Sequence, residues 1–328
     1  MKSEEREERE KIVYAIIGPT AVGKTRAGME LAGMTDSEII SVDSRQVYRY
    51  LDIGADKISP EDRRAIPHHL IDVADPDEIF TAADFVTRAS SAIERIRARG
   101  KTPLLVGGTA LYYRALEGAM LSESLPKDEK TRQNLEEEAK LRGTQALHKR
   151  LITVDPQAAS RIHPNDKFRL MRALEIFELS GRSATDMYRE SKKMSASVKI
   201  RYFGIDAPRR RLYESIERRV EDQFRSGYPE EVKWLLDNGY PRSLPALQGF
   251  GYRELVLYLD GLMTFDEAMR GDVKSTKAFA RRQLTWFKHF YPIIWFDLSD
   301  KSLENTAKDM KKIISEGVYE SKAESGDR

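Results

Sequence analysis

The chain has 328 residues, of which 40% are hydrophobic and 33% charged, with a net charge of +2 and no cysteine. This composition is typical of a globular protein with room for an α/β core and a second lobe, and it excludes disulfides, thiol catalysis and cysteine-ligated zinc. The small net charge excludes nucleic-acid binding by bulk attraction, so any such binding requires local basic stripes.

The sequence predicts neither a targeting signal nor a membrane span. The N-terminal stretch "MKSEEREEREK" lacks the apolar segment of a signal peptide, and the apolar runs elsewhere are far shorter than the roughly 20 residues that a spanning helix needs. We therefore expect a cytoplasmic protein with no membrane partner. Polar residues 1–11 and 317–328 are predicted to be flexible tails.

Apolar runs alternate with helical patterns over residues 12–120. Helices are predicted at Lys24–Ala32 and Thr81–Arg99, and strands at Val13–Gly18, Glu38–Val42, His69–Val73 and Pro103–Gly107. Strands that are apolar throughout and separated by helices are typical of a parallel sheet covered on both faces. Residues 12–120 are thus predicted to form the first part of an α/β core.

Residues 121–197 contain only helical patterns, at Asp128–Arg142, Thr144–Ile152, Asp166–Ser180 and Ser183–Ser191. We interpret them as a helical insertion domain. The second part of the core, residues 198–316, begins with a strand at Val198–Pro208. It continues with helices at Arg209–Ser226, Glu230–Asn238, Gly251–Leu259 and Phe265–Phe290 and a strand at Ile293–Asp297.

A glycine loop joins the first strand to the first helix. Its spacing, Gly18, four residues, then Gly23-Lys24-Thr25, fits the Walker A pattern, in which backbone N–H groups and a helix N-terminus surround phosphate oxygens. The core is therefore predicted to be P-loop NTPase-like, and the Thr25 hydroxyl suits Mg²⁺. The alternative is a tight turn without a ligand. The predicted diphosphate-binding residues are Gly18, Pro19, Thr20, Ala21, Val22, Gly23, Lys24 and Thr25.

Two polar residues follow predicted strands on the ligand side of the sheet. Asp43 comes directly after "IISV", where a carboxylate can accept a proton or hold Mg²⁺ through water; the alternative is a turn cap. Thr109 follows Gly107-Gly108 and is expected either at the mouth of the ligand crevice or as a plain helix N-cap.

Basic residues lie among aromatic ones in two later segments. Arg169 and Arg172 share one face of the insertion helix, and "KSTKAFARRQLTWFKHFY" mixes lysines and arginines with Phe279, Trp286 and Phe287. This pattern suits a folded RNA, whose phosphates need neutralising and whose splayed bases stack on rings. The alternative is an amphipathic helix with a solvated basic side.

Eight segments taken together resemble the bacterial tRNA dimethylallyltransferases, also called tRNA isopentenyltransferases. They are "GPTAVGKT", "SVDSRQVYRYLDIG", "PHHLIDVADP", "TAADF", "PLLVGGTALYYRAL", "IHPNDKFRLMRALEIFELSG", "LQGFGYREL" and "STKAFARRQLTWFKHF". The resemblance runs from Val13 to Phe290. It implies Mg²⁺-assisted transfer of a dimethylallyl group from dimethylallyl diphosphate. The acceptor it implies is the exocyclic amine of the adenosine 3′ of the anticodon, in tRNAs that read codons beginning with U.

The resemblance also assigns residues. It implies that Asp43 is the general base, that Thr109 lies near the adenine, and that Arg219, beside Arg218, grips the diphosphate. We expect a monomer that binds the anticodon stem-loop. The implied tRNA contacts are Asp43, Ser44, Arg45, Gln46, Thr109, Phe168, Arg169, Leu170, Met171, Arg172, Gln248, Gly249, Phe250, Gly251, Tyr252, Arg253, Arg281, Arg282, Gln283, Trp286 and Lys288.

The chain departs from the family pattern at one point, since Ala55-Asp56 stands where many members have Thr-Ala. Two other functions account for part of the pattern. A small-metabolite kinase would use Asp43 to deprotonate a hydroxyl that attacks a γ-phosphate. An ATP-driven RNA-binding switch would hydrolyse nucleotide and leave the RNA unmodified. The kinase would account for the glycine loop and Asp43 but not for the basic segments or the insertion.

Overall fold

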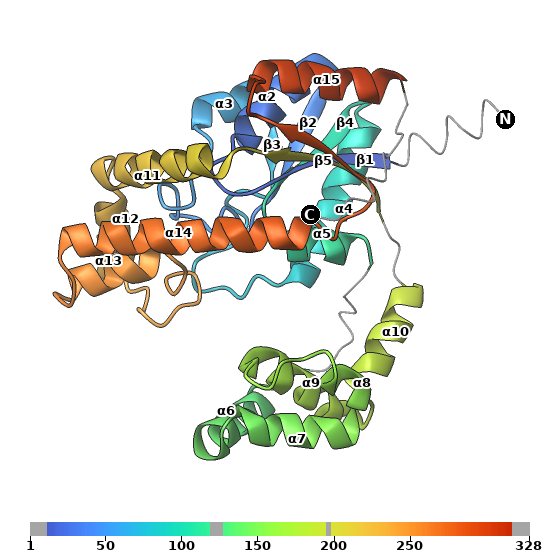
Figure 1. Cartoon of the computed structure of the whole chain (residues 1–328), viewed down its shortest axis with the longest axis vertical. Helices are drawn as coiled ribbons and strands as arrows, with labels where there is room; N and C mark the ends of the chain where they lie inside the picture. Colours follow the sequence, from blue (N-terminus) through green and yellow to red (C-terminus); the bar gives the residue numbers. More distant parts are fainter. Residues whose placement is uncertain (1–11, 119–126, 195–197, 317–328) are drawn as a thin grey trace. The chain divides into compact units, whose positions relative to one another are not determined.

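The computed structural model describes residues 12–118, 127–194 and 198–316 (Figure 1). The chain divides into two compact units, one made of residues 1–116 and 198–328 and the other of residues 117–197. The second unit thus begins at residue 117, where we expected an insertion from residue 121. The tails predicted at residues 1–11 and 317–328 lie outside the described residues.

The first unit contains a six-stranded parallel sheet in the order β3-β2-β4-β1-β5-β6 (Figure 1). The central strand β1 pairs with β4 on one side and with β5, which follows the second unit in sequence, on the other. This confirms the predicted α/β fold class. The strands are β1 (Ile12–Ile17), β2 (Ser37–Val42), β3 (His68–His69), β4 (Thr102–Gly107), β5 (Lys199–Asp206) and β6 (Ile293–Asp297).

Apolar side chains fill both faces of this sheet. In β1, Val13, Ala15 and Ile17 belong to one core and Ile16 to the other. Burial on both faces explains why the strands read as continuous apolar runs. Helices α2 (Lys24–Thr35), α11 (Arg209–Arg225) and α15 (Leu303–Glu316) contribute to the core of one face, and α4 (Ala82–Ala98) and α5 (Ala110–Leu116) to that of the other.

The strand predicted at His69–Val73 is wrong. Only His68 and His69 pair with β2. Leu70 and Asp72 then adopt left-handed backbone conformations, with φ of +63° and +58°, which turn the chain out of the sheet. The carboxylate of Asp72 is bound instead by Lys57 at 2.5 Å and Arg63 at 2.6 Å.

Several helices complete the first unit. The predicted helix at Phe265–Phe290 ends at Phe287, and helices α3 and α15 were not predicted. The long helix α14 begins with a capping box, in which Thr264 and Glu267 each bond the backbone N–H of the other through their side chains. It packs on α11 and α13. The remaining helices are α3 (Pro60–Ala65), α12 (Tyr228–Asp237), α13 (Tyr252–Leu259) and α14 (Phe265–Phe287).

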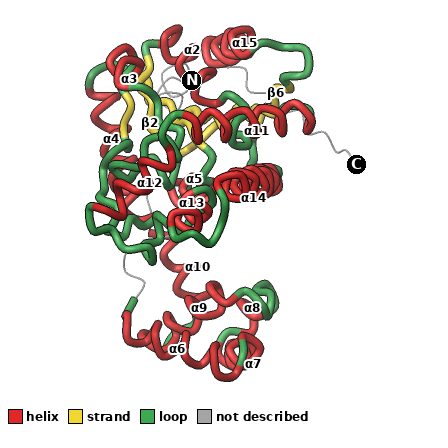
Figure 2. Tube along the Cα trace, turned by 90° about the vertical axis from the view of Figure 1, so that its left-hand side faces the viewer, coloured by secondary structure: helices red, strands yellow, loops and turns green. Residues whose placement is uncertain are grey.

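The second unit is built from helices and loops in its described part (Figure 2). Its core includes Leu147, Leu151, Leu170 and Leu174. The buried carboxylate of Glu175 accepts the backbone N–H of Asp128 and pairs with Arg172. The helices are α6 (Glu129–Arg142), α7 (Thr144–Val154), α8 (Pro156–Ala159), α9 (Lys167–Ser180) and α10 (Ala184–Met194).

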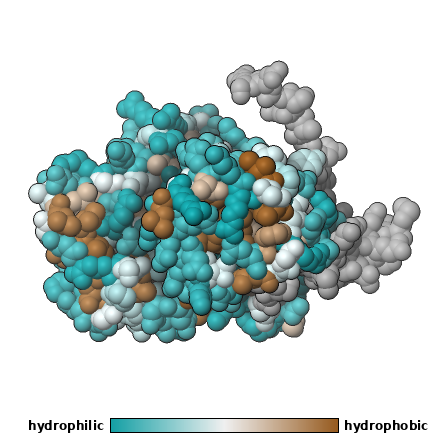
Figure 3. Space-filling view, turned by 90° about the horizontal axis from the view of Figure 1, so that it is seen from below, coloured by the Kyte–Doolittle hydropathy of each residue, from teal (hydrophilic) through white to brown (hydrophobic). Residues whose placement is uncertain are grey.

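The surface is mainly polar on the face seen in Figure 3, where apolar residues gather in separate patches. Among the helices of the described ranges, none combines the length and hydrophobicity needed to cross a bilayer.

A buried acid on α14 supports the loop before α13. Asp272 is 3% exposed, accepts a 2.9 Å hydrogen bond from the Thr276 hydroxyl, and lies against Gly251. Gly251 has φ of +81°, and a Cβ there would lie 2.6 Å from Tyr228 Oη and 2.8 Å from Asp272 Oδ2. Only glycine fits this position. Burial raises the pKa of Asp272 from 3.8 to about 6.

The raised pKa predicts a pH-dependent cost for Asp272. The unfolded chain releases the proton near pH 4, whereas the folded protein keeps it to about pH 6, so stability falls across that window as pH rises. Asp272→Asn lacks this cost and keeps the acceptor for Thr276. Its free energy of unfolding relative to wild type should rise by on the order of 1–3 kcal/mol from pH 4 to 6 and then level off. Urea unfolding at several pH values measures this, and a difference that does not change with pH would contradict it.

Candidate functional site

The phosphate loop, residues 18–25, joins β1 to α2 and requires both its glycines. Gly23 has φ of +99°, and a Cβ there would lie 2.7 Å from the Leu303 side chain at the start of α15. A Cβ on Gly18 would lie 2.3 Å from the backbone oxygen of Ile205 in β5. Close packing on both sides therefore holds the loop in the tight turn that directs N–H groups toward an anion.

Lys24 closes this loop from inside. Its ammonium group donates a 2.7 Å hydrogen bond to the backbone oxygen of Pro19. Desolvation lowers the pKa of Lys24 to about 8, a shift that the carboxylates of Asp43 and Asp56 oppose and that Arg219 adds to. An incoming phosphate oxygen would supply the negative charge that this buried cation lacks.

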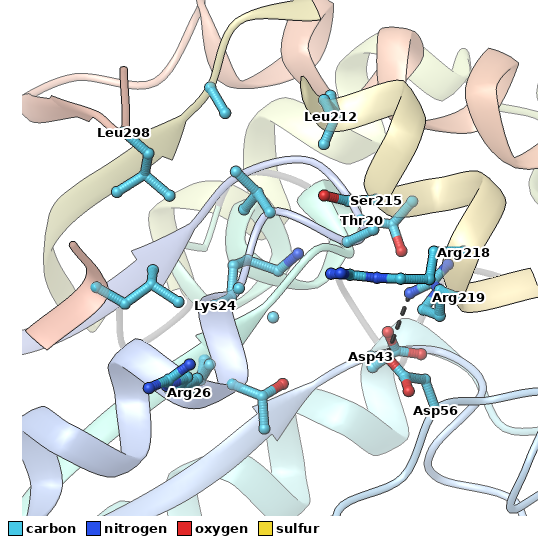
Figure 4. A pocket seen from close by; sticks show the side chains of 18 of the residues that line it. Thr20, Lys24, Arg26, Asp43, Asp56, Leu212, Ser215, Arg218, Arg219 and Leu298 are labelled. Carbon is cyan, nitrogen blue, oxygen red and sulfur yellow. Dashed lines mark hydrogen bonds and ion pairs between the residues drawn. The ribbon is translucent and has the colours of Figure 1, made fainter. Parts of the chain in front are cut away.

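The phosphate loop opens into a cavity of about 580 Å³, which we call the donor cavity (Figure 4). Its walls come from the loop, from the carboxyl ends of β2 and β4, and from α11. In a parallel sheet this edge is where ligands bind. The polar residues of its walls include Thr20, Lys24, Thr25, Arg26, Ser41, Asp43, Gln46, Asp56, Arg211, Ser215, Arg218, Arg219 and Asp222.

Asp43 caps a turn and also lies on the wall of the donor cavity. Its Oδ1 accepts hydrogen bonds from the backbone N–H groups of Arg45 at 2.8 Å and Gln46 at 3.4 Å, which makes it a turn cap. The same carboxylate lines the donor cavity (Figure 4). The cap holds the carboxylate in one orientation at the cavity wall.

Thr109 connects the loops that follow β2 and β4. Its hydroxyl accepts the backbone N–H of Ser44 at 3.1 Å, and its own N–H donates to the backbone oxygen of Val42 at 3.1 Å. These bonds fix Thr109 beside the Asp43 turn.

Arg219 and Arg218 both line the donor cavity, and Arg219 is the more buried of the two (Figure 4). Its Nη1 lies 3.2 Å from Asp56 Oδ2, while its Nε is buried and has no hydrogen-bond partner among the described residues. A buried N–H donor without a partner in the protein suits an anionic ligand. The burial favours Arg219, the residue that the resemblance implied.

The side chain of Gln283 is buried and not on the surface. The resemblance counted it among the tRNA contacts, but it is 5% exposed and both ends of its amide are occupied. Oε1 accepts the backbone N–H of Thr20 at 2.8 Å, and Nε2 donates to the backbone oxygen of Gly108 at 2.9 Å. Gln283 therefore ties α14 to the phosphate loop and to the loop after β4.

Four more of the implied tRNA contacts are buried. Leu170 and Met171 belong to the core of the second unit, and Tyr252 is fully buried, with its hydroxyl 2.8 Å from Glu231. Gly251 lies under Tyr228 and Asp272. These positions support the surfaces around them, because their side chains are enclosed by the protein.

Other implied contacts are accessible. Phe168 is 85% exposed on α9 and Trp286 40% exposed on α14. Arg45 and Phe250 are half-buried, with the Arg45 guanidinium 3.7 Å from the ring centroid of Phe250, so the segments 43–46 and 248–253 meet. Gln46 and Gly249 are half-buried, as is Arg172, which pairs with Glu175. The remaining exposed contacts are Ser44, Arg169, Gln248, Arg253, Arg281, Arg282 and Lys288.

Because Gln283 holds the phosphate loop through two hydrogen bonds, we expect their removal to lower the affinity for diphosphate. Gln283→Met keeps the size of the side chain and removes both hydrogen bonds to the loops. Inorganic pyrophosphate should bind about fivefold more weakly, as expected for roughly 1 kcal/mol of lost loop support. Isothermal titration calorimetry measures this. Gln248→Met, on an exposed loop outside the donor cavity, should bind pyrophosphate as wild type does; equal affinity for all three proteins would contradict the role of Gln283.

Comparisons with known proteins agree on one family. A family model described as IPP transferase matches residues 46–290. The tRNA dimethylallyltransferase of Geobacter metallireducens is 43% identical over 296 residues, which cover 90% of this chain and 96% of the relative. The tRNA dimethylallyltransferase of Halalkalibacterium halodurans is 40% identical over 315 residues, covering 96% and 99%.

Solved structures give the same result. The full-length tRNA isopentenylpyrophosphate transferase from Bacillus halodurans matches with a TM-score of 0.69 and 39% identity, over 93% of this chain and 96% of the other. A eukaryotic dimethylallyltransferase, captured acting on tRNA, matches with a TM-score of 0.78 and 27% identity, over 92% and 77%.

Proposed function

The chain belongs to the IPP transferase family, and on that premise we propose that it transfers a dimethylallyl group from dimethylallyl diphosphate to tRNA. The acceptor is the exocyclic amine of the adenosine 3′ of the anticodon, in tRNAs that read codons beginning with U. One observation carries this proposal: the phosphate loop, Arg219, whose Nε is unpaired among the described residues, and the carboxylate of Asp43 line the same cavity.

The donor side of the reaction uses the phosphate loop, Lys24 and Arg219. The bond that breaks joins the first carbon of the dimethylallyl group to the diphosphate oxygen, and its electron pair stays with the diphosphate. A diphosphate leaves readily once its charge is neutralised. Lys24, at the start of α2, and the guanidinium of Arg219, on α11, supply that charge at the wall of the donor cavity.

Mg²⁺ belongs to this proposal as the cofactor. The Thr25 hydroxyl and the Asp56 carboxylate line the same cavity, and no cluster of three histidine or acidic residues that could hold a metal occurs within the described ranges. This sparse set of protein oxygens fits Mg²⁺, which takes one or two protein ligands and completes its shell with phosphate oxygens and water. When bound, the ion supplies positive charge to the leaving diphosphate.

The acceptor side uses Asp43. An aromatic exocyclic amine is a weak nucleophile because its lone pair is delocalised into the ring. As the nitrogen attacks carbon, Asp43 takes the N–H proton, so that no cationic product accumulates. The backbone donors on Oδ1 keep the carboxylate in place for this transfer.

The tRNA side uses the accessible basic and aromatic residues. The target adenosine has to leave the anticodon loop to reach Asp43, which costs least for an unpaired base. Arg281 and Arg282 on α14, Lys288 directly after it and Arg169 on α9 are exposed for phosphate contacts. Trp286 and Phe168 are exposed for stacking.

Asp43→Asn tests the base. The amide keeps the turn cap but cannot accept the proton, so transfer should fall by about 10²–10⁴-fold while tRNA affinity stays near that of wild type. The assay follows radiolabel from dimethylallyl diphosphate into unmodified tRNA in the presence of Mg²⁺. Asp237→Asn, an exposed position on α12, is the matched control and should transfer normally. Normal turnover by Asp43→Asn would show that another group takes the proton.

Arg282→Ala and Arg169→Ala test the RNA surface. Each should weaken tRNA binding and lower the slope of log affinity against log salt by about 1, because one phosphate contact is lost. Fluorescence anisotropy over a salt series measures both quantities. Arg210→Ala removes an arginine that is 92% exposed on α11 and should leave the slope unchanged. Slopes that are the same for all four proteins would exclude these contacts.

A further inference from the structure

The loop between β2 and α3 brings a second carboxylate, Asp56, to the wall of the donor cavity. This loop is firmly held, because the half-buried carboxylate of Glu231 accepts the N–H groups of Asp52 at 2.8 Å, Ile53 at 2.6 Å and Gly54 at 3.2 Å. Asp56 itself has φ of +52°, and its backbone oxygen accepts a 3.1 Å hydrogen bond from Gln46. Asp56 is therefore positioned by its surroundings.

The carboxylate of Asp56 forms an ion pair with the guanidinium of Arg219. Asp56 Oδ2 lies 3.2 Å from Arg219 Nη1, as the dashed line in Figure 4 shows. Arg219 is mostly buried, at 21% side-chain exposure, and its Nε lacks a partner among the described residues. The guanidinium thus has an anionic partner from the protein at Nη1, while its Nε–H is available to an anion that enters the cavity.

The Asp56–Arg219 pair disfavours the binding of a diphosphate that carries no metal ion. Such a ligand is strongly anionic, and in the donor cavity it would lie beside the Asp56 carboxylate and compete with it for Arg219. A divalent cation removes the conflict, because it binds a carboxylate and phosphate oxygens at once. Asp56 is well placed for such an ion, since it and Thr25 together line the donor cavity and a neighbouring cavity on the α2 side.

We propose that Asp56 makes capture of the diphosphate depend on Mg²⁺. In the free protein Asp56 neutralises Arg219. When the donor binds, Arg219 would pass to the diphosphate, and Asp56 and Thr25 would be the residues that hold the cation. Asp56 is thus a specificity-determining residue that selects the metal-bound diphosphate over the bare one. This inference rests on the donor site of the proposed function.

Binding of inorganic pyrophosphate by isothermal titration calorimetry tests the proposal, with Mg²⁺ or with EDTA. Asp56→Asn should keep the loop, because asparagine also adopts the left-handed conformation. In EDTA this variant should bind pyrophosphate about three- to tenfold more tightly than wild type does, and Mg²⁺ should raise its affinity by a smaller factor. The proposal would be overturned if Mg²⁺ raised the pyrophosphate affinity of both proteins by the same factor. It would also be overturned if Asp56→Asn bound pyrophosphate more weakly than wild type both with Mg²⁺ and with EDTA.

Two further variants make the result specific. Asp222→Asn removes one negative charge from the same cavity wall and leaves the Arg219–Asp56 pair. Mg²⁺ should therefore raise its affinity for pyrophosphate by the same factor as in wild type. If it behaves as Asp56→Asn does, a general change of charge is responsible and the proposal fails. Lys24→Ala should abolish pyrophosphate binding. Unchanged binding by Lys24→Ala would instead show that the donor site itself is wrong, which separates failure of the proposed function from failure of this inference.

Discussion

The proposed function depends on one constraint, which is that the backbone of residues 18–25 must turn its N–H groups around a diphosphate. Neither glycine of that turn has room for a Cβ, because β5 lies against Gly18 and α15 against Gly23. Gln283 holds the turn from a third side through the N–H of Thr20. Elements from far along the chain therefore converge on one short loop and hold its backbone in place.

The parallel sheet then brings the two halves of the chemistry together. Because the strands run in one direction, the loops after β1, β2 and β4 meet at one edge, where α11 also lines the donor cavity. In the proposed function, the phosphate loop and Arg219 serve the leaving group, and Asp43 serves the attacking nitrogen. Thr109 links the loops after β2 and β4 through its bonds to Ser44 and Val42. The Asp56–Arg219 pair adds control over the form in which the donor enters.

Local patterns in the sequence predicted the parts that depend on local structure. The phosphate loop, Asp43 at a strand end and the helical segments follow from spacing and periodicity, and the resemblance pointed to Arg219. Gln283 was missed as a loop support because its partners are 263 and 175 residues away in sequence. The strand at His69–Val73 was wrong because left-handed residues inside an apolar run leave no pattern. Leu170, Met171 and Tyr252 were assigned to tRNA because a matching motif does not reveal which of its side chains point inward.

The central claim is that the diphosphate leaves intact from the phosphate loop while the carbon–oxygen bond breaks. Dimethylallyl diphosphate with oxygen-18 in the bridge between carbon and phosphorus tests it directly. After turnover with tRNA, mass spectrometry of both products locates the isotope. The account predicts that all of the heavy oxygen appears in the released diphosphate and none in the modified tRNA. Heavy oxygen retained with the transferred group, or a phosphorylated RNA product, would mean that a phosphorus–oxygen bond breaks and would contradict the account.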